Sequence, residues 1–539
     1  MKKILFFMLF TALAFGCQFS PKKEPKDKSL NSKYNEHLNI SIGFWDIQDM
    51  VNNTKGDEIL SLIEKKFNIT ISPLSVNWND YKEHYQILSA TNNLPDLFAS
   101  VTMSSSDNNG FSSLDKLIYS KSIRSLPDDL SPYPNVENII KMCSPIYTYG
   151  GKYYALPRTS FQDIKLSSSD ASMLIRKDWM ENLNIAAPQS LEKFIELTSA
   201  FAHKDPDGNG LDDTIGYNVN NRIALGKWLM LGIAPKCNVY SWIEEDGKYI
   251  PSYITKDFEK VITAYRKLYN VGGLDPNFYV KKPTDSLSDF ASGKLGALEY
   301  KSSPSSVNKL QKQWDLYQRK PFQDCVGTLQ IFPAEDGNYY SNTSSIYWSE
   351  SLFSSKVDDK KMDRILSLYD YLLSEEGTNL IKYGIENVDY VKENGEYKCT
   401  VDVKNISLSH SLFKKYPSLY LFNSLSTWGG TRDDFRKTEI NNLRFGNHAV
   451  HLANEDLKWN LKNTIPVKRP FNFILTPKES TEYFTTEAIV DDFTKIIIGK
   501  SDPIEMWHKT LDEYYKNGLN EYIERQNQLY LDYLKTQEK

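Results

Sequence analysis

The chain has 539 residues, of which 40% are hydrophobic and 25% are charged, so it carries enough apolar material for a packed core. This composition excludes a disordered, a fibrous or a polytopic membrane protein. The 64 Lys and Arg residues against 69 Asp and Glu residues leave a net charge of -5, and no basic block interrupts the body of the chain, which argues against a nucleic-acid partner. At about 100–200 residues per domain, we expect two large lobes.

The N-terminal segment has the pattern of an export signal. Lys2 and Lys3 precede an apolar run over residues 4–15, which is shorter than the roughly 20 residues that span a membrane. The run ends at Gly16-Cys17 and resembles a bacterial lipoprotein cleavage site, although Phe15 stands where a small residue is usual. We therefore predict a signal peptide over 1–16, a lipid on Cys17 and a polar tether over 17–37. The alternative is an ordinary secreted protein in which Cys17 is incidental.

The remaining cysteines lie far apart and form no C-x-x-C pair, which argues against zinc ribbons and thioredoxin chemistry. They are Cys143, Cys237, Cys325 and Cys399. An exported compartment permits disulfides, but the spacing assigns none.

The first part of the body predicts parallel α/β layers. Residues 39–44 alternate as in a strand, a helical pattern carries Ile59, Leu62 and Ile63, and residues 94–100 form a second strand. Ligands of open α/β sheets lie beyond the carboxyl ends of the strands, so Trp45 and Asp46 are candidate binding residues. The alternative for Trp45 is an aromatic residue packed on its own lobe.

Further along, a strand at 174–176 leads into a helix that Asp178 is placed to cap. Residues 258–269, 360–380 and 503–534 have the apolar spacing of amphipathic helices, with a break at Gly518 in the last. No Gly/Ser linker interrupts the body, which favours lobes joined by crossing strands.

The segment 205–216 predicts a calcium loop. Oxygen-bearing side chains alternate along it, with Gly210 at the sixth position. In an EF-hand, positions one, three, five, seven, nine and twelve surround Ca2+. The first five of these roles fall to Asp205, Asp207, Asn209, the Leu211 carbonyl and Asp213, whereas position twelve is Gly216. The alternative is an acidic turn that holds no metal.

The 10 Trp and 34 Tyr residues stand out, because aromatic faces stack on sugar rings in exported sugar-binding proteins. We expect Trp179 and Trp507 to be core residues and Trp242 to pack beside a hairpin turn at 246–247. The better stacking candidates lie in loop-like sequence. They are Trp45, Trp228, Trp348 and Trp428.

No motif predicts catalysis. His448 and His451 could share a helical face, but no third metal ligand accompanies them, so we expect a solvated or core pair. No G-x-S-x-G or Walker motif occurs. A glycosidase needs only two carboxylates, which the sequence does not exclude.

Taken together, several segments resemble one family, the bacterial extracellular solute-binding proteins of family 1, and in particular its large branch of oligosaccharide and alginate binders. The matching segments are 94–98 (LPDLF), 151–158 (GKYYALPR), 176–179 (RKDW), 205–216, 290–297 (FASGKLGA), 374–377 (SEEG), 498–500 and 518–522. Each motif is weak alone, but they occur in the family's order.

The resemblance implies a periplasmic-binding-protein-like α/β clamp of two discontinuous lobes joined by hinge strands. We expect lobe 1 over 38–155 and 343–388, and lobe 2 over 156–342 and 389–539, with crossings near 155–158, 333–342 and 383–391. The family pattern points to Glu299 and Tyr300 after the F-x-x-G-K-x-G-A segment, and supports Trp228. Asp46, Arg158 and Glu299 are the candidates for hydrogen bonds to a sugar.

The resemblance further implies a monomeric binding lipoprotein of an ABC sugar importer, without enzymatic activity, on the extracytoplasmic face of the cell membrane. It would hold a structural Ca2+ and deliver an oligosaccharide to permease subunits. Two other classes stay open at this point. One is a surface adhesin or sensor without a transporter, and the other is a polysaccharide-degrading enzyme that uses the same cleft.

Overall fold

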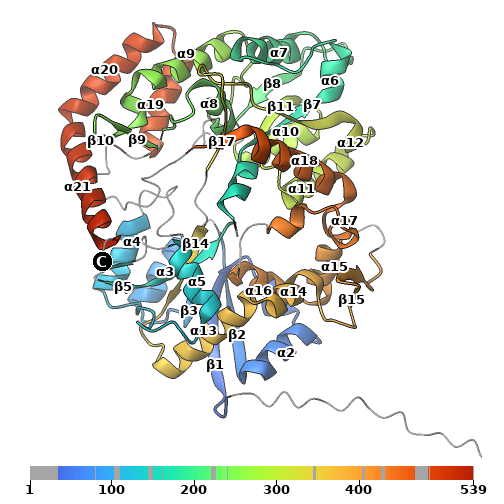
Figure 1. Ribbon diagram of the computed structural model, residues 1–539, viewed down its shortest axis with the longest axis vertical. Coiled ribbons are helices and arrows are strands. Elements are labelled where there is room, and N and C mark those ends of the chain that lie inside the picture. The colour runs from blue at the N-terminus through green and yellow to red at the C-terminus, as the bar shows by residue number, and fades with distance from the viewer. Residues whose placement is uncertain are drawn as a thin grey trace, which may run out of the picture.

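The computed structural model describes residues 34–78, 80–101, 110–143, 148–149, 151–161, 163–219, 226–239, 241–343, 347–403, 407–426, 431–467, 484 and 486–537. Two lobes lie one above the other, each built on its own sheet (Figure 1). The predicted α/β clamp of two discontinuous lobes is confirmed. None of the helices in the described ranges combines the length and apolar character needed to cross a bilayer.

The sheet of lobe 1 has five strands. In spatial order they are β2 (Ile69–Val76), β1 (Leu38–Trp45), β3 (Leu97–Ser100), β14 (Tyr347–Phe353) and β6 (Ala155–Thr159). The strand-helix-strand pattern of the sequence is present, but β2 between the helix and the second strand was not predicted. Strand β2 contains Pro73, which is tolerated there because β2 is an edge strand.

Helices and two short hairpins pack around this sheet. The helices are α1 (Gln48–Asn52), α2 (Glu58–Phe67), α3 (Tyr81–Ala90), α4 (Gly110–Tyr119), α5 (Pro134–Cys143), α13 (Asp359–Leu373), α14 (Glu375–Tyr383), α15 (Leu408–Lys415) and α16 (Ser418–Ser426). The hairpins are β4 (Thr148–Tyr149) with β5 (Lys152–Tyr153), and β15 (Tyr390–Glu393) with β16 (Glu396–Cys399).

The sheet of lobe 2 has four strands. Their spatial order is β12 (Val326–Leu329), β7 (Ser172–Arg176), β11 (Leu295–Tyr300) and β8 (Ile215–Asn218). Two more two-stranded units complete this part of the fold. They are the hairpin of β9 (Trp242–Glu245) and β10 (Lys248–Pro251), and the parallel pair of β13 (Tyr339–Ser341) and β17 (Thr464–Pro466).

Helices cover both faces of the lobe 2 sheet (Figure 1). They are α6 (Lys177–Asn182), α7 (Leu191–His203), α8 (Lys227–Ile233), α9 (Lys256–Asn270), α10 (Pro283–Ala291), α11 (Pro304–Tyr317), α12 (Phe322–Cys325), α18 (Asn447–Asn463), α19 (Thr486–Ile498), α20 (Pro503–Lys516) and α21 (Leu519–Gln537). Helix α17 (Glu439–Phe445) and the 3-10 helices η1 (Ile164–Asp170), η3 (Ser252–Ile254) and η4 (Arg432–Phe435) complete the described elements.

The chain after residue 388 departs from the predicted lobe boundary. Leu408, Leu412, Leu419 and Phe422 belong to the hydrophobic core of lobe 1, although 389–539 was assigned to lobe 2. The chain enters the lobe 2 core only at Ala449. The third crossing between the lobes therefore lies between Ile440, the last residue of the lobe 1 core, and Ala449, and not at 383–391.

Asp178 does not cap α6 as the sequence suggested. The helix begins at Lys177, two residues earlier than a cap at Asp178 requires, and its N-cap is Arg176. The Asp178 carboxylate instead accepts two hydrogen bonds from the Arg176 guanidinium, at 2.8 and 2.7 Å. This bidentate ion pair is almost fully buried, so Asp178 compensates a buried cation.

The two core tryptophans and the hairpin were predicted correctly. Trp179 and Trp507 are fully buried. Trp242 packs on the ring of Tyr522 at 5.6 Å beside the turn of β9 and β10. Asp246 and Gly247 both have positive φ there, which the tight turn requires.

Candidate ligand-binding site

One edge of the lobe 1 sheet collects the carboxyl ends of β1, β2, β3 and β6. Strand β1 pairs in parallel with β2 and β3, and β14 runs antiparallel to β3 and β6. The amino end of β14 therefore lies at this same edge. The chain leaves the edge after Thr159 and returns to it at Tyr347.

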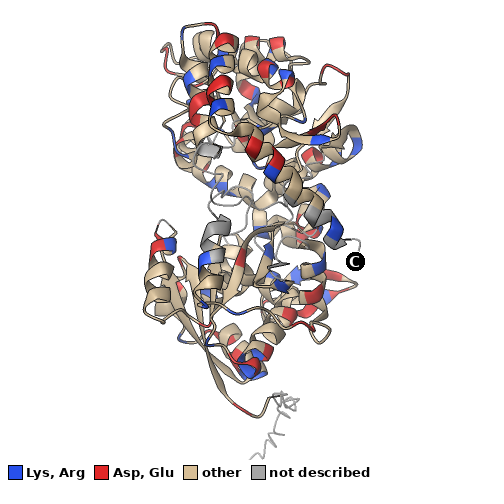
Figure 2. Cartoon of the chain, turned by 90° about the vertical axis from the view of Figure 1, so that its left-hand side faces the viewer, with Lys and Arg blue, Asp and Glu red and all other residues tan. Residues whose placement is uncertain are grey.

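The lobe 2 sheet has a corresponding edge. Strand β11 is parallel to β8, and β7 is antiparallel to β11 and β12, so the amino end of β7 lies beside the carboxyl ends of the other three strands. The chain enters this edge at Ser172 and leaves it after Leu329. Two passages of the chain join the two edges. The first follows Thr159 and contains η1, which lies between the lobes (Figure 1), and the second follows Leu329 and contains β13. Figure 2 shows the narrow waist at this level. The two edges therefore face each other.

Four rings form an aromatic cluster at the lobe 1 edge. It consists of Trp45, Trp78, Tyr81 and Trp348. The ring centroid of Trp45 lies 5.0 Å from that of Trp78 and 5.9 Å from that of Trp348. Trp45 is only 3% exposed, whereas Trp78 is 41% exposed. Trp78 therefore offers the open face of the cluster, and Trp45 supports it from below.

The low exposure of Trp45 argues against its role as a stacking residue, and the high exposure of Trp78 adds a new candidate. Trp45 is packed on its own lobe, which is the alternative that the sequence left open, and Trp348 is half-buried in the cluster. Trp78 was not predicted, although it follows the carboxyl end of β2 as Trp45 ends β1. The same rule would have found it once β2 was recognised.

Arg158 and Asp46 flank the cluster in different ways. Arg158 is fully buried, donates to the Ser349 hydroxyl at 2.7 Å, and places its guanidinium 4.7 Å from the centre of the Phe44 ring. Burial lowers the pKa of Arg158 to about 10. Arg158 thus lies within the lobe and not on its surface. Asp46 is exposed, and its backbone N–H donates to the Val76 carbonyl at 2.9 Å, which joins the ends of β1 and β2.

Glu299 is buried in lobe 2 and has partners of its own. It accepts hydrogen bonds from the Tyr217 hydroxyl at 3.2 Å and from the Trp228 backbone N–H at 3.0 Å. Burial raises its pKa to about 7, against the effect of these hydrogen bonds. Glu299 therefore fastens the start of α8 to the sheet. The next residue, Tyr300, is half-buried at the end of β11.

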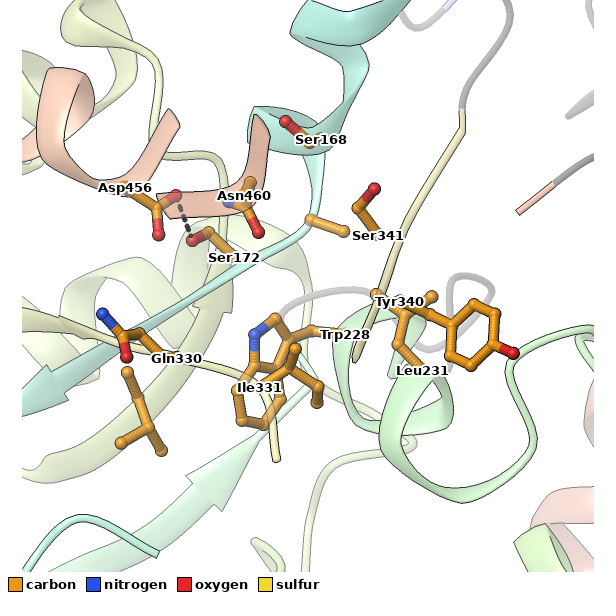
Figure 3. Close-up of a pocket in the computed structure, with 12 residues that line it drawn as sticks. Ser168, Ser172, Trp228, Leu231, Gln330, Ile331, Tyr340, Ser341, Asp456 and Asn460 are labelled. Atoms are coloured by element: carbon orange, nitrogen blue, oxygen red, sulfur yellow. Dashed lines mark hydrogen bonds between the residues drawn. The ribbon is translucent and has the colours of Figure 1, made fainter. Parts of the chain in front are cut away.

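Trp228 is mainly a core residue. Its ring lies 5.7 Å from that of Phe194 and 6.1 Å from that of Phe332, and the residue is buried. Trp228 nevertheless reaches a small pocket at the lobe 2 edge (Figure 3). The pocket lies between the two passages and has room for little more than one water-sized group. Its polar lining includes Ser168, Ser172, Gln330, Asp456 and Asn460.

Asp456 and Asn460 had no signal in the sequence. They stand on α18, the helix on which the sequence singled out His448 and His451. His448 packs against the Phe322 ring at 5.7 Å, and burial lowers its pKa. Across the described ranges, no three His, Cys, Asp or Glu side chains lie close enough to hold a metal ion.

The loop at 205–213 brings its polar side chains together. Asp205 accepts hydrogen bonds from the backbone N–H groups of Asn209 and Gly210, each at 3.0 Å. The Asn209 side-chain amide donates to Asp207 at 2.9 Å and to Asp213 at 3.3 Å. Desolvation and the neighbouring Asp205 raise the pKa of Asp207. The loop thus gathers oxygen atoms of the kind that a hard cation prefers, but here they accept hydrogen bonds from the loop itself and do not lie close enough together to form a metal-binding group.

The missing twelfth ligand of this loop has a structural reason. Gly216 already belongs to β8, where an added Cβ would lie 2.2 Å from the Thr198 carbonyl oxygen. A glutamate does not fit at this position. Of the other candidates, Cys17 and Trp428 lie outside the described residues.

Comparison with known proteins agrees with this architecture. No family model matches the chain. It is 28% identical to lipoprotein LipO of Bacillus subtilis (strain 168) over 419 residues, which cover 74% of this chain and 76% of LipO. It is 27% identical to the polygalacturonan/rhamnogalacturonan-binding protein YtcQ of the same strain over 267 residues, which are 49% of this chain and 51% of YtcQ.

Solved structures share the fold over nearly the whole chain. The S. pneumoniae ABC-transporter substrate-binding protein FusA, an EF-hand mutant in complex with fructo-nystose, matches with a TM-score of 0.67 at 15% identity, covering 92% of this chain and 100% of FusA. The alginate-binding protein AlgQ2 without calcium ion matches with a TM-score of 0.64 at 13% identity, covering 93% and 99%. The chain is therefore similar in sequence to LipO and YtcQ, and it shares its two-lobed fold with FusA and AlgQ2.

Proposed function

We propose that the protein is the binding lipoprotein of an ABC importer and captures an oligosaccharide between its two lobes. The observation that carries this proposal is the placement of an open aromatic face, Trp78, at one sheet edge and a polar pocket at the edge opposite. A sugar ring offers a C–H face that an aromatic ring can cover, and hydroxyl groups that polar side chains can bind.

Closure of the lobes follows from this arrangement. A ligand that contacts both edges binds the closed form better than the open form, and so shifts the population towards closure. The permease would recognise that closed form. The lobe assignment, with hinges in the passages around η1 and β13, is part of this proposal.

The relatives support the ligand class. YtcQ is named for binding polygalacturonan and rhamnogalacturonan, and FusA was solved with a fructose-based sugar. Both are binding proteins, which supports capture of the ligand without chemical change. The lipoprotein name of LipO supports a lipid on Cys17 at the extracytoplasmic face of the membrane.

We also propose that the loop at 205–213 holds a structural Ca2+. The donors would be the side chains of Asp205, Asp207, Asn209 and Asp213 and the Leu211 carbonyl. The oxygen-only donor set and the raised pKa of Asp207 support this assignment. The ion would neutralise the crowded carboxylates and fasten α7 to β8.

A ligand screen tests the function. Thermal shifts over plant, host and bacterial oligosaccharides would find the ligand, and calorimetry would give its affinity. Chromatography of the recovered ligand should show it unchanged. Formation of shorter products would favour an enzyme, and the absence of any binding oligosaccharide would overturn the proposal.

A further inference from the structure

The carboxylate of Asp456 is built into the lobe 2 edge, and its hydrogen bonds to described residues use one of its two oxygens. Asp456 is 5% exposed, and its Oδ2 accepts hydrogen bonds from the hydroxyls of Ser172 at 2.8 Å and Ser302 at 2.6 Å. No described residue donates a hydrogen bond to Oδ1. Since Asp456 lines the pocket, its carboxylate is fixed in direction by two serines and has an acceptor left for a ligand.

The surroundings of Asp456 match the chemistry of a sugar. Figure 3 shows Asp456 and Asn460 together on α18, with Trp228 and Gln330 across the pocket. The room in the pocket suits a single hydroxyl group. Because Asp456 lines a small, partly desolvated pocket, a ligand hydroxyl that donates to Oδ1 would gain more here than at an exposed carboxylate.

We propose that this pocket binds a hydroxyl of an uncharged sugar residue, and that Asp456 selects against uronates. The inference rests on the proposed function and names its substrate class. It differs from what the names of YtcQ and AlgQ2 would suggest, since polygalacturonan and alginate are polyanions.

Electrostatics supports the choice of a neutral sugar. In the described lining of the pocket, Asp456 is the one charged side chain. The neighbouring Lys301 forms an ion pair with Asp170 at 2.7 Å, so its charge is compensated. A sugar carboxylate that entered the pocket would approach the Asp456 carboxylate in a partly desolvated site, which is unfavourable.

The test compares one ligand in two charge states. The oligosaccharide found by the screen is oxidised at its primary hydroxyls, so that each hexose becomes a uronate, and both forms are titrated by calorimetry. We expect the oxidised form to bind at least tenfold more weakly. Asp456→Asn should reduce that ratio to less than about threefold, because an amide keeps the shape and removes the charge.

Glu455→Gln is the matched control. Glu455 precedes Asp456 on α18, but it is exposed and pairs with Lys437 at 2.8 Å. This variant removes the same charge outside the pocket and should keep the full ratio. An equal effect of both variants would indicate long-range charge and overturn the role of Asp456.

A second variant keeps the test independent of the stability of Asp456→Asn. Asn460→Lys places an ammonium group on the half-buried side of the same pocket and should improve binding of the oxidised form at least tenfold. Binding of a uronate as tight as that of its neutral form to the unaltered protein would overturn this inference alone. If no oligosaccharide binds in either charge state, the proposed function fails as well.

Discussion

At the scale of single residues, exposure separates the tryptophans that can contact a ligand from those that hold the lobe together. Trp78 is 41% exposed and stands on Trp45, Tyr81 and Trp348. Trp78→Ala should weaken oligosaccharide binding by roughly tenfold to hundredfold, about 1–3 kcal/mol, with little change in melting temperature. Calorimetry and thermal unfolding of the same samples check this.

Trp242→Ala is the control for Trp78→Ala. Trp242 is half-buried on Tyr522, in the hairpin of β9 and β10 and not in either main sheet. Its removal should lower the melting temperature and leave affinity unchanged. Equal affinity losses in the two variants would mean that Trp78 acts through general stability and not through contact.

Glu299 should make folding stability depend on pH. Its pKa is about 7 in the folded protein, mainly because of burial, and near 4.5 when unperturbed. The folded state therefore binds the proton more tightly than the unfolded state, and stability falls as pH rises from about 4.5 to 7 and then levels off. Glu299→Gln keeps an acceptor for Trp228 and Tyr217 but cannot ionise, so this part of the pH dependence should disappear.

Denaturant unfolding at pH 5 and pH 8 measures that difference. Glu335→Gln, at an exposed carboxylate paired with Lys260, should leave the change in folding stability between the two pH values as it is in the wild type. If the stability of Glu299→Gln changed between pH 5 and pH 8 as much as that of the wild type, other groups would be responsible for the pH dependence.

The sequence indicated where the strands of lobe 1 end, but not how exposed the side chains at those ends are. The strand-end rule placed Trp45 and Asp46 at the carboxyl edge of the lobe 1 sheet, because strands joined through a helix pair in parallel, as β1 and β3 do. Whether Trp45, Arg158 or Glu299 is exposed depends on neighbours that arrive from distant segments, such as Trp348 over Trp45 and Trp228 over Glu299. Asp456 was missed for the same reason, since its serine partners lie more than 150 residues away.

At the scale of elements, the loop between α7 and β8 carries the calcium prediction. Chelation should lower the melting temperature of the protein, because an ion present at a hundred times its Kd stabilises the folded state by about 2.7 kcal/mol. Asp207→Ala should cause the same loss and make added chelator nearly ineffective. Thermal unfolding with and without EDTA measures both effects.

Asp212→Ala is the matched control within this loop. Asp212 is exposed and stands between the proposed ligands Leu211 and Asp213, at a position that supplies no donor. It should retain both the wild-type melting temperature and the response to EDTA. A wild-type melting temperature that EDTA does not change would contradict the metal site.

The spacing of apolar residues predicted helices correctly, but it did not predict the lobe on which each helix packs. The amphipathic segments at 258–269 and 503–534 are helices, and the latter breaks at Gly518 between α20 and α21 as expected. The pattern shows which face of a helix is apolar, but not which lobe covers it. Helices α15 and α16 were therefore assigned to the wrong lobe.

At the scale of the whole molecule, the proposed function requires two lobes that close on a sugar. The passages that join the sheet edges are the places where the chain can bend while each sheet stays intact. The ordered family motifs made this architecture predictable, whereas the third passage was not, because it depends on how far the lobe 1 core extends along the chain.

Small-angle X-ray scattering of the mature protein with and without its oligosaccharide tests closure most directly. We expect the radius of gyration to fall on saturation with ligand, and Trp78→Ala to need correspondingly more ligand for the same change. An unchanged radius of gyration at full saturation, with binding confirmed by calorimetry in the same buffer, would contradict capture between closing lobes.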